Sequence, residues 1–148
     1  MTLFILNGPN MNLLGRREPH IYGHDTLADV ERLCRAEADA AGLALRFHQS
    51  NAEHELIGWI HEAFDEPADG IVFNPAAFSH SSYALHDALK ACACPIVEVH
   101  ISNIHARPEE WRHRSVTAAA STGIVSGLGI QGYALAIRAI AARREAKT

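Results

Sequence analysis

Two stretches of this 148-residue sequence carry side chains whose types and spacing suit proton transfer. Residues 7–24 form a polar segment in which Arg17 supplies a fixed positive charge and Tyr22 supplies a phenol. In the second stretch, Glu98 and His100 are two positions apart, so on a strand both side chains lie on one face. A carboxylate placed there can orient the imidazole and hold its proton, which predicts an acid–base pair. A structural ion pair is the alternative interpretation.

The polar segment, residues 7–24, shows neither helical nor strand periodicity. Structureless loops of this length in a compact domain are usually binding loops, lids or disordered segments. Because the segment carries two arginines and a phenol, and because Gly15 and Gly23 could serve as hinges, we interpret it as a lid over a binding site. A solvated, mobile connection is the alternative.

The elements that must position these groups follow from the hydrophobic pattern. Leu3 to Leu6 is an uninterrupted apolar run, which is typical of a strand buried on both faces of a parallel sheet. Further strands are expected at residues 43–48, 70–73, 96–99 and 124–126, and helices at 27–41, 53–65, 83–93 and 130–143. Thr26 and Asp29 predict a capping box for the first helix, which Gly42 should end.

Strands that alternate with helices require right-handed crossovers, and hence a parallel sheet with helices on both faces. We therefore predict an α/β fold, a flavodoxin-like three-layer sandwich whose five-stranded sheet has the order 2-1-3-4-5. The pattern contains no linker or repeat, which favours one domain over residues 1–148. Only residues 143–148 look like a frayed end.

In such sheets, ligands bind beyond the carboxyl ends of the strands, where the strand order switches. The ends of the first, third and fourth predicted strands present polar groups from Asn10, Asn74, His80, Glu98 and His100. A single histidine at a strand end is more often a satisfied structural group than a catalyst. The convergence of several such groups on one rim favours a binding site with acid–base chemistry.

Composition argues against several other classes of protein. A net charge of −4 with interspersed signs argues against a nucleic-acid surface. No apolar run approaches the roughly 18 residues that span a bilayer, and no basic region precedes the first strand, so we expect a cytoplasmic protein without membrane contact. Cys34, Cys92 and Cys94 provide neither a disulfide framework nor a four-cysteine zinc site, and we expect reduced, mostly packed thiols.

Three long motifs of this chain resemble those of type II 3-dehydroquinate dehydratase. They are LNGPNMNLLGRREPHIYG, NPAAFSHSSYALHDAL and VEVHISNIHAR, and the resemblance extends over essentially the whole sequence. It implies a flavodoxin-like fold and the removal of water from 3-dehydroquinate to give 3-dehydroshikimate, the third step of the shikimate pathway. It also implies that no cofactor is needed, and that the chain assembles into a homo-oligomer, a dodecamer built from trimers.

The resemblance further implies a role for each matching residue. Tyr22 resembles the base that takes the proton next to the ketone, and Arg17 the cation that favours its phenolate. Asn10 would hold a water molecule at the enolate oxygen. His100 resembles the acid that protonates the departing hydroxyl, with Glu98 as its orienter. The implied substrate ligands are Asn74, His80, Ile101, Ser102 and Arg112, with Asp87 reaching in from a neighbouring subunit.

One departure from the family pattern concerns the substrate arginine. The family usually places it four residues after the arginine of the SNxHxR segment, whereas Arg107 and Arg112 are five apart. An insertion in the loop explains this spacing. Arg112 follows the aromatic residue Trp111, as the family's arginine follows its own, so we assign the role to Arg112, with Arg114 as the alternative.

The lysines provide a check that does not depend on the resemblance. A Schiff-base dehydratase needs a buried lysine. Lys90 is expected on a helix away from the site and Lys147 in the frayed end, so neither is a credible nucleophile. Proton abstraction by a side-chain base through an enolate is therefore the expected route.

Three other functions are weaker alternatives. Residues 127–132, GLGIQG, form a G-x-G-x-x-G pattern and suggest a phosphate- or nucleotide-binding flavodoxin-like module, but the pattern follows the last strand and not the first. These glycines are better explained by close packing of the last helix. Ten histidines suggest a metalloprotein, but no defined ligand spacing is present. Serines flank His80, but a serine hydrolase would need a G-x-S-x-G elbow.

Overall fold

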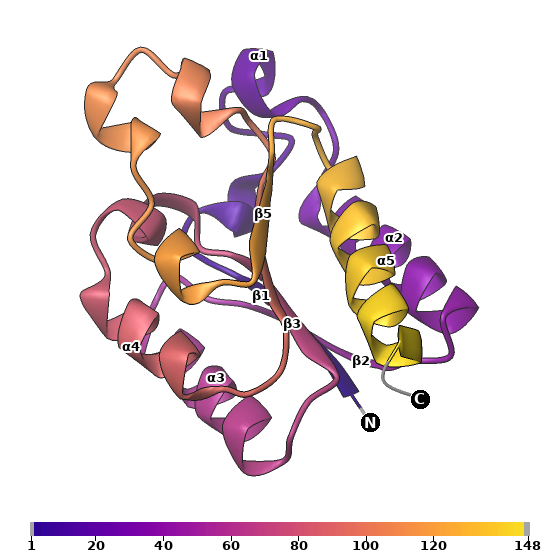
Figure 1. The fold of residues 1–148 in the computed structure, drawn as a ribbon. Helices are drawn as coiled ribbons and strands as arrows, with labels where there is room; N and C mark the ends of the chain where they lie inside the picture. Colours follow the sequence, from indigo (N-terminus) through magenta and orange to yellow (C-terminus); the bar gives the residue numbers. More distant parts are fainter. Residues whose placement is uncertain (1, 147–148) are drawn as a thin grey trace.

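A five-stranded parallel sheet forms the centre of the molecule in the computed structural model, which describes residues 2–146 (Figure 1). Its strands lie in the order β2-β1-β3-β4-β5, and every neighbouring pair is parallel. The strands are β1 (Thr2–Asn7), β2 (Ala44–Gln49), β3 (Gly70–Asn74), β4 (Ile96–His100) and β5 (Gly123–Ser126). The predicted fold class and strand order are confirmed.

Helices cover both faces of this sheet (Figure 1). They are α1 (Pro19–Tyr22), α2 (Leu27–Ala40), α3 (Glu53–Asp65), α4 (Tyr83–Ala91) and α5 (Gln131–Ala146). The helices α2 and α5 pack on one face, and α3 and α4 pack on the other. α5 extends three residues beyond its predicted end, and residues 147 and 148 of the predicted frayed end lie outside the described residues. Within residues 2–146, none of the helices has the length and apolarity to cross a membrane.

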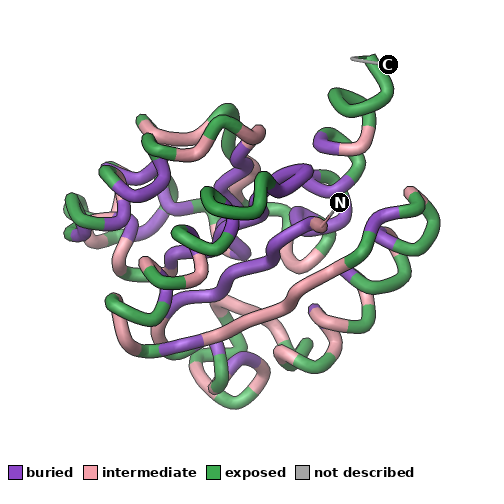
Figure 2. The backbone as a smooth tube through the Cα atoms, turned by 90° about the horizontal axis from the view of Figure 1, so that it is seen from below, coloured by how far each residue is buried: buried purple, intermediate pink, exposed green. Residues whose placement is uncertain are grey.

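The apolar run of β1 is buried on both of its faces (Figure 2). Leu3 and Ile5 belong to the core under α2 and α5, whereas Phe4 and Leu6 belong to the core under α3 and α4. All four side chains are at most 1% exposed. A strand with two buried faces needs consecutive apolar residues, which explains why this segment does not alternate.

The start and end of α2 follow the predicted signals. The Thr26 backbone N–H donates to Asp29 Oδ2 at 2.8 Å, and the Asp29 N–H donates to Thr26 Oγ1 at 3.3 Å, which completes the capping box. Gly42 lies just beyond the helix with a φ of 70°, a conformation that favours glycine. Caps of this kind contribute about 0.5–2 kcal/mol. Local sequence signals therefore determine both ends of the helix.

Two glycines of the GLGIQG segment are required by close packing. A Cβ atom on Gly132 would lie 3.1 Å from Val99 Cγ1, which shows how closely α5 approaches the sheet. Gly127 has a φ of 91°, and a Cβ there would lie 2.9 Å from Asn103 Cβ. The predicted packing role of this segment is therefore confirmed at Gly132, and the glycines need no phosphate ligand to explain them.

The polar segment, residues 7–24, contains more local structure than its sequence predicted. A 3-10 turn occupies Met11–Leu13, and α1 forms one helical turn over Pro19–Tyr22. Local backbone hydrogen bonds close these turns, such as the bond from Tyr22 N–H to Glu18 O at 3.1 Å. A single turn is too short to show a hydrophobic periodicity in the sequence. At Gly15, φ is 86° and a Cβ would lie 2.8 Å from His24 O, so close contact already requires glycine there. Its use as a hinge stays a prediction.

The three cysteines are free thiols. Cys34 is buried between α2 and the sheet, and this burial raises the pKa of its thiol to about 12. Cys92 and Cys94 are partly buried against the opposite core. The expectation that the thiols are packed is therefore confirmed, and their reduced state stays a prediction.

Candidate active site

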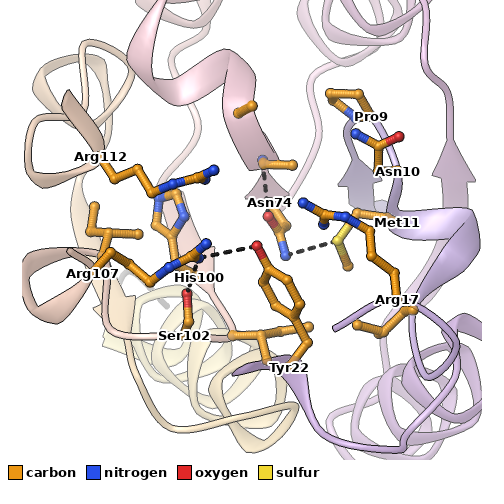
Figure 3. A pocket seen from close by; sticks show the side chains of 15 residues that line it. Pro9, Asn10, Met11, Arg17, Tyr22, Asn74, His100, Ser102, Arg107 and Arg112 are labelled. Carbon is orange, nitrogen blue, oxygen red and sulfur yellow. Dashed lines mark hydrogen bonds between the residues drawn. The ribbon is translucent and has the colours of Figure 1, made fainter. Parts of the chain in front are cut away.

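A pocket opens at the carboxyl ends of β1, β3 and β4, where the strand order predicted a site (Figure 3). It collects side chains from the polar segment and from the loops that follow these strands. Its polar lining consists of Asn10, Arg17, Tyr22, Asn74, His100, Ser102, Arg107 and Arg112. Among the described residues, neither Asp nor Glu lines this pocket. Three guanidinium groups therefore line the pocket, and two of them also contact carboxylates outside the lining, Arg17 with Glu18 and Arg112 with Glu109.

The phenol of Tyr22 is held by two cations (Figure 3). Arg107 donates from Nη1 to the Tyr22 hydroxyl at 3.0 Å, and its Cζ lies 5.4 Å from the ring centroid. Arg17 Cζ lies 5.0 Å from the same centroid, and its guanidinium also pairs with Glu18 at 3.3 Å. The sequence assigned a cation to this phenol at Arg17 only. The structure places Arg17 at the ring and Arg107 at the hydroxyl.

Arg107 is fixed by the loop after β4. The 3-10 turn Ile104–Ala106 begins at Asn103, whose Oδ1 accepts the His105 N–H at 3.1 Å. Arg107 follows this turn and is 9% exposed, and its Nη1 also donates to Ser102 Oγ at 3.2 Å. Its buried Nε finds no acceptor within the described part of the chain. Sequence reasoning missed this residue, although it ends the VEVHISNIHAR motif.

Glu98 and His100 form the expected pair on β4. His100 Nε2 lies 2.7 Å from Glu98 Oε2. The carboxylate is completely buried and His100 is 5% exposed, so the pair lies at the base of the pocket. An ionised carboxylate has no proton to donate, so Glu98 accepts this hydrogen bond and His100 Nε2 donates it. Nδ1 is then the ring nitrogen that remains available to a ligand. The prediction of a carboxylate–imidazole pair is confirmed.

A buried chain of hydrogen bonds fixes the amide of Asn74. Its Nδ2 donates to the Tyr133 hydroxyl at 2.9 Å and lies 3.6 Å from Met11 Sδ, while its Oδ1 accepts the Ala76 N–H at 3.0 Å. The Tyr133 hydroxyl in turn donates to Asn7 Oδ1 at 2.6 Å. Both protons of the Asn74 amide are therefore engaged within the protein, and Oδ1 retains one lone pair for a ligand.

Comparison with known proteins identifies the family to which this chain belongs. The family described as "Dehydroquinase class II" matches residues 1–141. The chain belongs to the class II dehydroquinase family. A relative from Agrobacterium fabrum named "3-dehydroquinate dehydratase 2" is 60% identical over 93% of each chain. A 3-dehydroquinate dehydratase from Sinorhizobium medicae is 54% identical over 94% of this chain and 93% of its own.

Solved structures of class II dehydroquinases share the fold. The crystal structure of type II dehydroquinase from Propionibacterium acnes matches with a TM-score of 0.91 at 45% identity, over 95% of this chain and 96% of that one. The enzyme from Butyrivibrio crossotus gives the same TM-score at 40% identity, over 95% and 97% of the two chains. The resemblance drawn from the three motifs is therefore confirmed.

Two of the substrate ligands that the resemblance implied, His80 and Asp87, do not line the pocket of this dehydroquinase. His80 donates from Nδ1 to the Arg114 carbonyl at 2.7 Å, and its ring packs edge-on against Trp111 at 5.3 Å. Burial lowers the pKa of His80, although the bond to Arg114 opposes this effect. The Asp87 side chain is 84% exposed on α4 and contacts His86 of its own helix at 3.2 Å. Within one chain, neither side chain reaches the pocket.

Arg112, not Arg114, lines the pocket of this dehydroquinase (Figure 3). Its Cζ lies 4.1 Å from the Trp111 ring centroid, and its Nε lies 3.2 Å from Glu109 Oε2. Arg114 borders a separate groove beside His80. Ile101 and Ser102 line the same pocket. The one-residue extension of the loop thus keeps Arg112 at the site.

Within residues 2–146, the structure contains no group of three or more His, Cys, Asp or Glu side chains that could bind a metal ion.

Proposed function

We propose that this chain is a 3-dehydroquinate dehydratase, a hydro-lyase of the shikimate pathway that converts 3-dehydroquinate to 3-dehydroshikimate. Membership of the class II dehydroquinase family and the names of its curated relatives support this reaction. The observation that carries it is one pocket with two proton-transfer groups, the Tyr22 phenol bound to Arg107 and the His100 imidazole bound to Glu98. A cytoplasmic location, expected from the sequence, belongs to the same proposal.

In the proposed mechanism, Tyr22 and His100 each carry out one of the two proton transfers of the elimination. As a phenolate, Tyr22 takes the proton next to the ketone, and the electrons of that C–H bond move to the ketone oxygen to form an enolate. Asn10, at the rim of the pocket, would hold a water molecule against this oxygen. The enolate then collapses and the C–O bond of the hydroxyl breaks. His100 acts in its doubly protonated form, with Nε2–H bound to Glu98, and gives its Nδ1 proton to the leaving hydroxyl to form water.

The charge of the pocket fits the substrate. 3-Dehydroquinate carries one carboxylate, and the pocket is lined by Arg17, Arg107 and Arg112 but by no Asp or Glu of the described residues. Backbone and hydroxyl donors of Ile101 and Ser102 lie at the end of β4, where a carboxylate can accept them. Charge-assisted hydrogen bonds of this kind are the strong ones.

A direct assay tests the proposal. On addition of 3-dehydroquinate, we expect ultraviolet absorbance from the conjugated enone product. The rate should be unchanged by a chelator, and a titration with nucleotide should give no thermal or spectral response. A lack of enone formation by the purified wild-type protein would overturn the proposed function.

Arg112 and Arg114 provide a test of substrate binding. Arg112→Ala should raise KM by roughly one to two decades, because charged hydrogen bonds to the substrate are worth about 1.5–3 kcal/mol. Arg114→Ala removes a matched guanidinium that borders the other groove, so its KM should stay close to that of the wild type. Steady-state kinetics of the two variants decide the assignment, and the reverse ranking would show that the loop was aligned wrongly.

We also propose that the functional enzyme is a homo-oligomer, a dodecamer built from trimers, in which Asp87 completes the site of a neighbouring subunit. The exposed Asp87 side chain has no role in its own pocket, which supports this arrangement. Asp87→Ala should assemble normally yet lose most of its activity, while Asp65→Ala, at the end of α3, serves as a control. A fully active monomer in light scattering at assay concentration would refute the shared site.

A further inference from the structure

Glu98 is bound by more groups than its partnership with His100 requires. Besides the bond from His100 Nε2, Oε2 accepts the hydroxyl of Ser115 at 2.6 Å, and Oε1 accepts the hydroxyl of Thr117 in a short bond. Glu98 and Thr117 are both completely buried. A carboxylate removed from water is therefore surrounded by three donors, each from a different residue of the chain.

The hydrogen bonds of this cluster are complete when Glu98 is ionised. Ser115 Oγ accepts the Ala118 N–H at 3.0 Å, so its own proton is free to point at the carboxylate. Thr117 Oγ1 lies 3.1 Å from Ser115 Oγ and has one proton, which the Glu98 bond uses. Ionised carboxylates only accept hydrogen bonds and have lone pairs for all three donors. The two hydroxyls thus offset the cost of burying the charge.

We propose that Ser115 and Thr117 are positioning residues for proton transfer by His100. By holding Glu98 ionised and in one orientation, they keep one imidazole proton on Nε2 and direct Nδ1 into the pocket, where the doubly protonated ring donates its second proton. The effect on turnover rests on the proposed function, whereas the effect on the imidazole does not. Neither hydroxyl lines the pocket, so both act through Glu98.

The segment that carries these hydroxyls also delivers Arg112 to the pocket. The 3-10 turn Glu110–His113 contains Arg112, and Ser115 and Thr117 follow directly. Val116 N–H donates to the Ser79 carbonyl at 2.7 Å, which attaches the segment to the loop after β3. The arginine that lines the pocket and the two hydroxyls that hold Glu98 therefore belong to one chain segment.

Kinetics of hydroxyl-deleted variants test the proposal. Thr117→Val keeps the shape of the side chain and removes the donor, and Ser115→Ala removes the other. We expect kcat to fall about tenfold to a hundredfold in each, as for a misplaced catalytic group. KM should change by less than about twofold, because substrate binding is not touched. Thr117→Ser should recover most of the lost kcat. Ser121→Ala, which removes a hydroxyl bound only to the Thr117 carbonyl, is the matched control.

A measurement on the free enzyme separates positioning from general destabilisation. A protected Nε2 proton of His100 should give a downfield proton resonance with slow exchange, assigned by its loss in His100→Gln. We expect this resonance in the wild type, Thr117→Ser and Ser121→Ala, and its loss or broadening in Thr117→Val and Ser115→Ala. Melting temperatures report whether each variant is folded.

The outcomes are distinct. If folded Thr117→Val and Ser115→Ala keep the imidazole resonance and wild-type kcat, the two hydroxyls are only structural and the proposal is overturned. If Thr117→Val is too unstable to assay, Thr117→Ser against Thr117→Ala gives the same comparison at reduced temperature. If the wild type forms no enone, the proposed function fails, and the resonance alone still decides whether the hydroxyls position His100.

Discussion

Replacement of Tyr22 by phenylalanine should lower kcat by several decades while substrate still binds. The substitution removes the proton acceptor and leaves the ring, its packing and the three pocket arginines in place. General-base catalysis typically contributes about 10²-fold or more. Steady-state kinetics and a binding titration measure both parts of the prediction. A variant that keeps more than about a tenth of wild-type kcat would exclude Tyr22 as the base.

The surroundings of Tyr22 must stabilise its phenolate strongly if the phenol is to act as a base near pH 7. Free tyrosine is ionised to only about one part in a thousand at pH 7, so a fully formed phenolate needs roughly 4 kcal/mol of stabilisation. The Arg107 bond at 3.0 Å and the Arg17 guanidinium 5.0 Å from the ring centroid provide two cations in a partly closed site. Arg17→Ala should therefore lose activity comparable to that lost by Tyr22→Phe.

Controls for this experiment are available in the chain. Tyr83, 66% exposed on α4, lies outside the pocket, and Tyr83→Phe should retain wild-type kcat. Arg107→Ala tests the cation at the hydroxyl separately from Arg17. If both arginine variants keep wild-type kcat while Tyr22→Phe is inactive, then the phenolate is not stabilised by these cations.

Replacement of His100 by glutamine should abolish elimination but spare the first proton transfer. The glutamine amide can still donate to Glu98, so the buried carboxylate keeps a partner, but an amide cannot act as the acid. We expect kcat for dehydration to fall by at least about 10². In deuterated water, the substrate should nevertheless take up deuterium next to its ketone, because the enolate still forms and then reverts.

The same exchange experiment distinguishes the two proton-transfer groups. Tyr22→Phe should neither exchange the proton next to the ketone nor eliminate water, whereas His100→Gln should exchange without eliminating. Nuclear magnetic resonance of the recovered substrate measures the exchange. Exchange by Tyr22→Phe together with its absence in His100→Gln would show that His100 performs both transfers and that Tyr22 only packs in the pocket wall.

The sequence by itself determined those features that depend on local order. Leu3 to Leu6 indicated a strand with two buried faces, and the alternation of strands and helices led to the sheet order, because crossover handedness leaves few arrangements. Thr26 and Asp29 predicted the cap of α2. Glu98 and His100 were paired correctly because a strand brings every second side chain to the same face.

Only the tertiary structure decided which distant side chains meet. Arg107 reaches the Tyr22 hydroxyl across 85 positions of sequence, and His80 turns to the Arg114 carbonyl and away from the pocket. Ser115 and Thr117 carry no periodic signal, yet they surround Glu98. These contacts depend on the paths of loops, which are set by their backbone bonds and by the elements they join. Loop paths cannot be predicted from hydrophobic periodicity, because periodicity indicates only which face of a helix or strand is buried.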